Sequence, residues 1–289
     1  MQRVMITGAG GFVGRHVVAA LGDDFEIVTP HQGNCRVNLL DPGAPRKVVE
    51  RAKPDLLIHL AWETEHGRFW TAPSNTLWQT ASSELFQAFF ECGGVRAVGL
   101  GSCAEYDWTN GSGIFAEDAP LAPHTPYGVA KVATSNILRE AAQRHSRSHA
   151  WGRVFFSFGI GEPTGRLIPL MLKAVLDQTP LDIGPASTVR DFWDVRDLGA
   201  SIAALALSDV SGPVNLGSGE GISFGDLARM IESIAGVDNL IHPDRRPLGA
   251  GEPVSLVPDI SKLRRDVSLK PQYNMHRAIT EYLRAFRQG

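Results

Sequence analysis

A strand, a glycine-rich turn and an amphipathic helix follow one another at the start of the chain, and this order restricts the possible folds more than any other feature. The segment reads RVMITGAGGFVGRHVVAAL, with Gly8, Gly11 and Gly14 in the pattern T-G-x-x-G-x-x-G. Glycines at these places allow a tight turn, let the backbone approach a pyrophosphate and let the helix pack closely on the sheet. The phosphates then meet free N–H groups at the helix N-terminus. We therefore expect a dinucleotide at this turn, in contact also with Phe12 and Val13.

Strand-like apolar runs and helix-like periods alternate over the first part of the chain. Repeated alternation of this kind predicts parallel strands with helices on both faces, and right-handed crossovers make such a sheet doubly wound. The expected fold class is therefore α/β, with a Rossmann-like doubly wound parallel sheet. Strands are expected at 25–29, 55–61, 95–101 and 150–158, and helices at 44–52, 75–91 and 127–145.

Glycine and proline become frequent after Gly159, where helices alternate with loops. This change predicts a smaller C-terminal substrate lobe that covers the carboxyl edge of the sheet. The segment 187–217 reads as strand–helix–strand and is expected to rejoin the main sheet, so that the two lobes interleave in sequence. The expected division is 1–160 with 187–217 for the dinucleotide-binding domain, and 161–186 with 218–289 for the substrate-binding lobe.

Charge and composition exclude several classes of partner. A formal net charge of −3 gives no long-range attraction to nucleic acid or to an anionic membrane. The longest uncharged apolar run is too short to span a bilayer, and the N-terminus lacks a signal-peptide pattern. Three cysteines without a C-x-x-C pair favour a reduced, cytoplasmic protein. No metal is expected, since His242 and His276 lack the spacing of metal ligands.

The residues after the second expected strand bear on which dinucleotide binds. NAD sites usually carry an acidic residue about 20 positions beyond the glycines, where it binds the ribose 2′-OH. Here the strand ends in TPHQGNCR, which contains no carboxylate. His31 and Arg36 are instead suited to a 2′-phosphate, although an ordinary loop role is an equal alternative. This favours NADP(H), with NAD(H) possible.

A tyrosine and a lysine lie four positions apart at the start of the helix expected at 127–145. Tyr127 and Lys131 therefore share one face of that helix. An ammonium near a phenol is expected to lower the pKa of Tyr127, which would let it exchange protons near neutral pH. Upstream, GSCAEYD supplies a hydroxyl at Ser102. A hydrolase built on Ser102 is not favoured, because the chain lacks a G-x-S-x-G elbow.

TGAGGFVG, Ser102, YGVAK and VRDFWDV together resemble the extended short-chain dehydrogenase/reductase family, in the branch that acts on nucleotide sugars. The resemblance extends over essentially the whole chain, including DISKLRRDVSLKPQYN near the C-terminus. It implies that Tyr127 transfers a proton and that Lys131 holds the nicotinamide ribose and tunes the tyrosine. It also implies that Ser102 hydrogen-bonds the reacting oxygen, which makes these three the expected catalytic residues.

The same resemblance implies further contacts with cofactor and substrate. Arg190 matches an arginine that grips the substrate diphosphate, a role that suits the guanidinium fork. An ordinary surface role is an equal alternative for Glu63, His66, Arg166 and Arg246. The expected cofactor residues are Gly8, Gly11, Phe12, Val13, Gly14, His31, Arg36, Asn38, Leu39, Leu60, Ala61, Trp62, Asn75, Tyr127 and Lys131, and the expected substrate residues are Ser102, Cys103, Glu63, His66, Phe156, Arg166, Arg190 and Arg246.

Departures from the family's patterns bear on the reaction. Dehydratases of this branch carry an aspartate and a glutamate where this chain has Cys103 and Ala104. An asparagine of many epimerases falls on Phe156 here. With the missing acid after the second strand, these departures favour reduction of the C4 ketone of a nucleotide-linked 4-keto-6-deoxyhexose. A nucleotide-sugar 4-epimerase with tightly bound NAD is the first alternative, and a non-catalytic dinucleotide-sensing protein is the second.

The resemblance also implies a homodimer. In the family, the helices that correspond to 75–91 and 127–145 pair with their copies in a four-helix bundle. Their apolar content allows this arrangement, although an internal core would explain it too.

Overall fold

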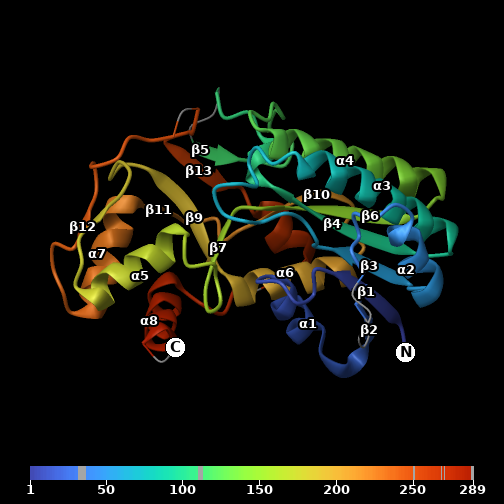
Figure 1. Ribbon diagram of the computed structural model, residues 1–289, viewed down its shortest axis with the longest axis horizontal. Coiled ribbons are helices and arrows are strands. Elements are labelled where there is room, and N and C mark those ends of the chain that lie inside the picture. The colour runs from blue at the N-terminus through green and yellow to red at the C-terminus, as the bar shows by residue number, and fades with distance from the viewer. Residues whose placement is uncertain (32–36, 110–112, 250, 268, 270, 288–289) are drawn as a thin grey trace.

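The main body of the protein is a six-stranded parallel sheet with helices on both faces. The structure is a computed structural model that describes residues 1–31, 37–109, 113–249, 251–267, 269 and 271–287 (Figure 1). Every neighbouring pair of strands in this sheet is parallel. The strands lie in the order β10-β6-β4-β3-β1-β2, with bounds β1 Arg3–Thr7, β2 Glu26–Val28, β3 Leu56–His59, β4 Arg96–Ser102, β6 Ser148–Val154 and β10 Gly212–Leu216. The predicted α/β class and doubly wound sheet are confirmed.

The two faces of the sheet have separate apolar cores. Helices α1 (Gly14–Leu21) and α6 (Val195–Leu207) cover one face, and α2 (Ala44–Ala52), α3 (Ser74–Glu91) and α4 (Pro126–Arg144) cover the other (Figure 1). Within β1, Val4 and Ile6 pack in the first core while Met5 packs in the second, as the alternation of strand side chains requires. Burial on both faces explains why these strands read as continuous apolar runs.

The strand order changes direction at β1. The chain proceeds from β1 to β2 on one side, and then to β3, β4, β6 and β10 on the other side. Doubly wound sheets bind ligands at the carboxyl ends of the strands beside such a point. The crevice between the ends of β1 and β3 is therefore the expected place for a ligand.

A second sheet lies beside the carboxyl ends of the main one. It is formed by β9 (Val189–Asp194), β11 (Gly221–Ser223), β13 (Ser255–Pro258) and β5 (Gly113–Phe115), and β7 (Phe156–Phe158) also pairs with β9. The segment 187–217 was expected to rejoin the main sheet. Its last strand, β10, does so and α6 covers one face of that sheet, but its first strand, β9, lies in the second sheet. The prediction is therefore wrong for that strand. This strand, β9, pairs instead with β11, β13 and β7. Its Asp191 is fully buried there, and the carboxylate accepts backbone N–H groups of Ser218, Gly219 and Glu220.

The remaining helices form a smaller group at the end of the molecule opposite α2 (Figure 1). They are α5 (Leu167–Asp177), α7 (Phe224–Ala235) and α8 (Met275–Phe286), which share a third apolar core. Two short strands, β8 (Leu181–Asp182) and β12 (Ile241–His242), pair beside them. Among the described residues, no helix combines the length and apolarity needed to cross a membrane. The division of the chain into lobes stays a prediction.

Candidate active site

The glycine turn after β1 is closely packed on itself and against the segment that follows β3. Gly8 has a φ of +73°, and a Cβ there would lie 2.9 Å from the backbone nitrogen of Ala61. A Cβ on Gly14 would lie 2.1 Å from the carbonyl oxygen of Gly8. The turn therefore closes on itself and on the segment after β3, and any side chain at Gly8 or Gly14 would open it.

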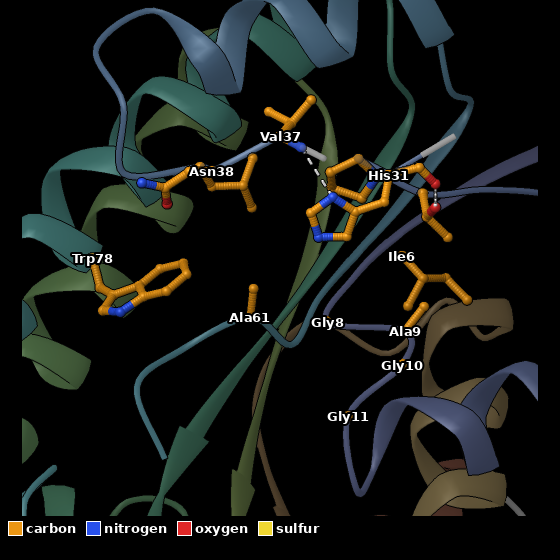
Figure 2. Close-up of a pocket in the computed structure, with 13 residues that line it drawn as sticks. Ile6, Gly8, Ala9, Gly10, Gly11, His31, Val37, Asn38, Ala61 and Trp78 are labelled. Carbon is orange, nitrogen blue, oxygen red and sulfur yellow. Dashed lines mark hydrogen bonds between the residues drawn. The ribbon is translucent and has the colours of Figure 1, made fainter. Parts of the chain in front are cut away.

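A cavity of about 700 Å³ lies at the point where the strand order changes direction. Figure 2 shows Trp78, from α3, and the glycine turn on opposite sides of it. Turn N–H groups and apolar walls suit the phosphates and adenosine of a dinucleotide, and none of the described lining residues is acidic. The lining residues are Ile6, Gly8, Ala9, Gly10, Gly11, Thr29, Pro30, His31, Val37, Asn38, Leu39, Ala61 and Trp78.

The cavity contains six of the predicted cofactor residues, namely Gly8, Gly11, His31, Asn38, Leu39 and Ala61. Phe12, Val13, Gly14 and Leu60 lie next to these in the chain, outside the lining. Arg36 falls outside the described residues. Trp78 was not predicted as a cofactor residue, because its helix was expected to pack in a dimer interface or in an internal core.

His31 is oriented by a backbone hydrogen bond. Its Nδ1 accepts from the N–H of Val37 at 3.0 Å, and the ring points into the cavity (Figure 2). Since Nδ1 is an acceptor, the neutral ring carries its proton on Nε2. The Nε2–H of His31 makes no hydrogen bond to another described residue, so it can donate within the cavity.

A chain of buried, hydrogen-bonded side chains connects the segments that line this cavity. Thr7 Oγ1 accepts the N–H groups of Leu60 and Ala61 and lies 2.7 Å from Nδ1 of His59. Nε2 of His59 lies 2.9 Å from Ser82 Oγ, which donates to the carbonyl of Trp78. Each hydrogen bond in this chain has one donor and one acceptor if the Thr7 hydroxyl donates to Nδ1 of His59 and the Nε2–H of His59 donates to Ser82 Oγ. Burial, followed by the charge of Lys131, lowers the pKa of this ring to about 3.

His59 is expected to make the protein sensitive to acid. Below the unfolded pKa of about 6.5, the unfolded chain binds a proton that the folded chain does not. The free energy of unfolding should thus fall as pH decreases from about 6.5 to about 3, by about 1.4 kcal/mol per pH unit. Urea unfolding at several pH values would show a shallower dependence in His59→Gln. His276→Gln, at an exposed position, is the control. Parallel curves for His59→Gln and the wild type would contradict this assignment.

The three predicted catalytic residues lie together at the end of β4. Ser102 is the last residue of β4, and Tyr127 and Lys131 lie in the first turns of α4. The side chain of Ser102 lies close enough to Tyr127 to lower the pKa of its phenol, against the effect of burial. Nζ of Lys131 donates to the carbonyl of Leu100 at 2.9 Å and lies 5.7 Å from the ring centroid of Tyr127. The arrangement places a hydroxyl, a phenol and an ammonium where a reacting oxygen can reach the first two.

Local sequence explains how α4 brings Tyr127 to Ser102. Thr125 caps the helix by accepting the N–H of Gly128 at 3.1 Å, and Pro126 occupies the first turn. A Cβ on Gly128 would lie 2.4 Å from the carbonyl oxygen of Ala104. The missing side chain at Gly128 therefore allows the start of α4 to approach the segment that follows β4.

The protonation of this site differs from the sequence-based expectation. Burial raises the pKa of Tyr127, although the side chain of Ser102 acts in the opposite direction. Burial also lowers the pKa of Lys131 to about 7, against the effect of the Glu105 carboxylate. The expected lowering of the Tyr127 pKa by Lys131 is wrong for this structure, because burial is the largest influence on this pKa and the Lys131 charge is not among the causes of its shift. Tyr127 is a proton donor at neutral pH.

Aromatic side chains from the segment after β3 enclose Tyr127 and Lys131. The ring centroid of Trp62 lies 3.7 Å from the Lys131 ammonium, a cation–π contact. Phe69 and Trp70 pack edge-on against Tyr127, with ring centroids 4.9 and 5.7 Å away. Phe69 and Trp70 were not predicted to reach the site. The only signal for them was their aromatic character in an otherwise polar loop.

Asn75 fixes this aromatic segment in place. Its Oδ1 accepts from Trp62 Nε1 at 2.9 Å, and its Nδ2 donates to the carbonyls of Phe69 and Ala72. Asn75 was expected near the nicotinamide. In this structure its amide holds the loop that covers Tyr127.

The predicted substrate residues lie in two separate places, and Glu63 and Arg246 belong to neither of them. Cys103 and Phe156 share an apolar cluster, and the guanidinium of Arg190 lies 5.7 Å from the Phe156 ring centroid. Arg190 is buried and pairs with Glu252 at 3.2 Å.

The second group lies near the start of α5. Arg166 pairs with the buried carboxylate of Glu162 at 3.3 Å, and its charge lowers the pKa of His66 further than burial does alone. Glu63 accepts the N–H of Glu65 within its own loop, and Arg246 is exposed. Of the predicted substrate residues, Phe156 and Arg190 therefore lie close to Cys103, the residue that follows Ser102.

Known proteins are similar to this chain in sequence and in fold. The model of the NAD dependent epimerase/dehydratase family matches residues 4–217. A UDP-glucose 4-epimerase from Azospirillum brasilense is 26% identical over 310 residues, covering 94% of this chain and 88% of that protein. A GDP-6-deoxy-D-mannose reductase from Pseudomonas aeruginosa is 24% identical over 305 residues, covering 98% and 96%. The solved structure of RMD from Pseudomonas aeruginosa complexed with NADPH has a TM-score of 0.87 at 22% identity, covering 100% of this chain and 99% of that chain. That structural likeness shows a shared fold.

Proposed function

Since the chain belongs to the NAD dependent epimerase/dehydratase family, we propose that it is an NAD(P)H-dependent reductase of the C4 ketone of a nucleotide-linked 4-keto-6-deoxyhexose. The observation that carries this proposal is the phenol of Tyr127, which lies beside Ser102 and is kept protonated by burial. A ketone reduction needs a proton donor at this place. Cys103 and Ala104 supply no acid for the loss of water, which argues against a dehydratase.

The mechanism follows from the positions of three side chains. A bound nicotinamide dinucleotide would supply the hydride, held by the glycine turn and the cavity beside it. Tyr127 gives its phenolic proton to the sugar oxygen as the ketone becomes an alkoxide. Ser102 hydrogen-bonds the same oxygen and stabilises its developing negative charge. The Lys131 ammonium stabilises the phenolate that remains after the transfer.

A direct assay separates this proposal from its main alternative. Purified protein is incubated with a panel of nucleotide-linked 4-keto-6-deoxy sugars and either NADPH or NADH, and the absorbance of the reduced nicotinamide is followed. A reductase oxidises the added cofactor in the presence of its substrate. Interconversion of C4 epimers by protein that retains NAD, with no added reductant, would instead favour a 4-epimerase.

We further propose that NADPH is the preferred cofactor. His31 offers an imidazole N–H inside the cavity, and no acidic residue is present among the described lining residues to bind a ribose 2′-OH. Solved structures of the same fold hold NAD in one case and NADPH in another, so the preference here depends on the hydrogen-bonding groups at the cavity wall.

His31→Asp is expected to shift the preference toward NADH. A carboxylate would repel a 2′-phosphate and accept a bond from the 2′-OH. The ratio of kcat/KM for NADPH to that for NADH should fall roughly tenfold or more, about 1.4 kcal/mol. His276→Asp makes the same change in charge at an exposed site and should leave the ratio unaltered. An unchanged ratio in His31→Asp would mean that this histidine does not select the cofactor.

We also propose that α3 and α4 form a homodimer interface. The two helices pack against each other, and Leu77 of α3 and Val129 of α4 are more than half exposed, at 56% and 54%. Exposed apolar side chains on adjacent helices support a second copy as the partner.

A further inference from the structure

A carboxylate is buried directly behind Ser102. Glu105 is 0% exposed and lies in the short 3₁₀ helix Cys103–Glu105 that follows β4. Its oxygens accept from the backbone N–H of Ser102 at 2.9 Å, from Trp151 Nε1 at 2.9 and 3.1 Å, and from Arg153 Nε at 2.9 Å. Each of these partners is an N–H donor. None of them can accept the proton of a carboxylic acid, and Arg153 is a cation, so these bonds favour the ionised form of Glu105 against burial, which raises its pKa.

Glu105 and Ser102 hold each other in a reciprocal arrangement. While Glu105 accepts the Ser102 N–H, Ser102 Oγ accepts the N–H of Ala104 at 3.2 Å, which completes a capping box. The neighbouring Gly101 makes room for this arrangement. A Cβ there would lie 2.0 Å from Glu105 Oε1 and 2.2 Å from Trp151 Nε1. Both the backbone and the hydroxyl of Ser102 are thus oriented through Glu105.

The charge of Glu105 reaches the proton-transfer pair as well as Ser102. The carboxylate raises the pKa of Lys131 and of Tyr127, although burial is the largest influence on both. Its effect keeps the phenol protonated and favours the ammonium. The ionisable groups that surround Glu105 are Arg153 of β6, Tyr127 and Lys131 of α4, and its neighbours Cys103 and Tyr106.

We propose that Glu105 is a positioning residue for the reaction, which orients Ser102 and supplies a fixed negative charge to the Tyr127–Lys131 pair. The proposal rests on the reductase function proposed above. The alternative is a purely structural role, in which Glu105 only neutralises the buried Arg153. That guanidinium also donates to the hydroxyl of Tyr106 and to the carbonyl of Glu117, so it has other partners.

Two variants of Glu105 distinguish the effect of its charge from the effect of its position beside Ser102. Glu105→Gln removes the charge, and Glu105→Asp keeps it while withdrawing the oxygen from the Ser102 N–H. Lys131 is followed in cofactor-free protein by ¹³C NMR of labelled lysine, and kcat is measured with NADPH and the reactive sugar. The control is Asp197→Asn, which alters a buried carboxylate in α6 that accepts the N–H groups of Gln272 and Tyr273.

The expected results differ between these variants. In Glu105→Gln, the Lys131 midpoint falls by about one pH unit, and kcat falls roughly tenfold or more while dinucleotide affinity is kept. In Glu105→Asp, the midpoint stays near that of the wild type while kcat falls. Asp197→Asn keeps the wild-type midpoint and kcat.

Other outcomes overturn the proposal. An unchanged Lys131 midpoint, or an unchanged kcat, in folded Glu105→Gln would leave Glu105 with a structural role only. If Glu105→Gln does not fold, Glu105→Asp decides, since wild-type kcat in that variant contradicts the positioning role. If the wild-type protein reduces none of the sugars, the proposed reductase function fails. The Lys131 titration then still tests the charge of Glu105, because it needs no substrate.

Discussion

Replacing Tyr127 with phenylalanine is expected to lower kcat by roughly a hundredfold to ten-thousandfold, the range for loss of a general acid. The phenol is the group that faces Ser102, and burial holds it in the protonated form that a ketone reduction consumes. Phenylalanine keeps the ring that Phe69 and Trp70 pack against. The variant should therefore fold normally and fail at proton transfer. Steady-state oxidation of NADPH with the reactive sugar measures the effect.

The matched control for this variant is Tyr282→Phe, which removes a buried hydroxyl from α8 in the third apolar core. Its kcat should equal that of the wild type. Dinucleotide affinity should fall far less than kcat in Tyr127→Phe, because the glycine turn and the cavity beside it do not include Tyr127. Wild-type turnover in Tyr127→Phe would refute the assignment of this residue as the acid.

Sequence patterns identify those parts of this fold that depend on neighbours close in the chain. The glycine turn is recognisable because strand, turn and helix are consecutive, and α2 was expected at the residues where it occurs. The assignment of β9 failed because a short strand carries no mark of the sheet that it joins. Its partners β13, β11 and β7 are distant segments that only the folded chain brings together.

In the candidate site too, the features that depend on segments distant in the chain could not be predicted from the sequence. The pairing of Tyr127 with Lys131 is readable from their spacing, but the direction of the Tyr127 pKa is not, because burial depends on Trp62, Phe69 and Trp70 from another segment. Glu105 gave no signal in the sequence beyond its place near Ser102. Its partners Trp151 and Arg153 lie on β6, and only the parallel register of β4 and β6, in which Gly101 faces Arg153, brings them to the carboxylate.

Gly14→Ala is expected to weaken dinucleotide binding roughly a hundredfold and to lower the melting temperature by roughly 2 to 10 °C, since overpacking of a close contact costs about 1–3 kcal/mol. The added Cβ would meet backbone atoms only, at 2.1 Å from the Gly8 oxygen and 2.8 Å from Cα and O of Ala9. Backbone cannot rotate away as a flexible side chain can. The turn must therefore open, which moves the N–H groups that are proposed to hold the phosphates.

Gly10→Ala provides the matched comparison within the same turn. A Cβ on Gly10 meets no atom within 4 Å among the described residues, so the melting temperature should stay at the wild-type value. Thermal unfolding without cofactor, together with titration of tryptophan fluorescence by NADPH, measures both effects in each variant. A Gly14→Ala protein that melts and binds like the wild type would show that the turn tolerates displacement. The close contact between α1 and Gly8 would then not be what shapes the cofactor site.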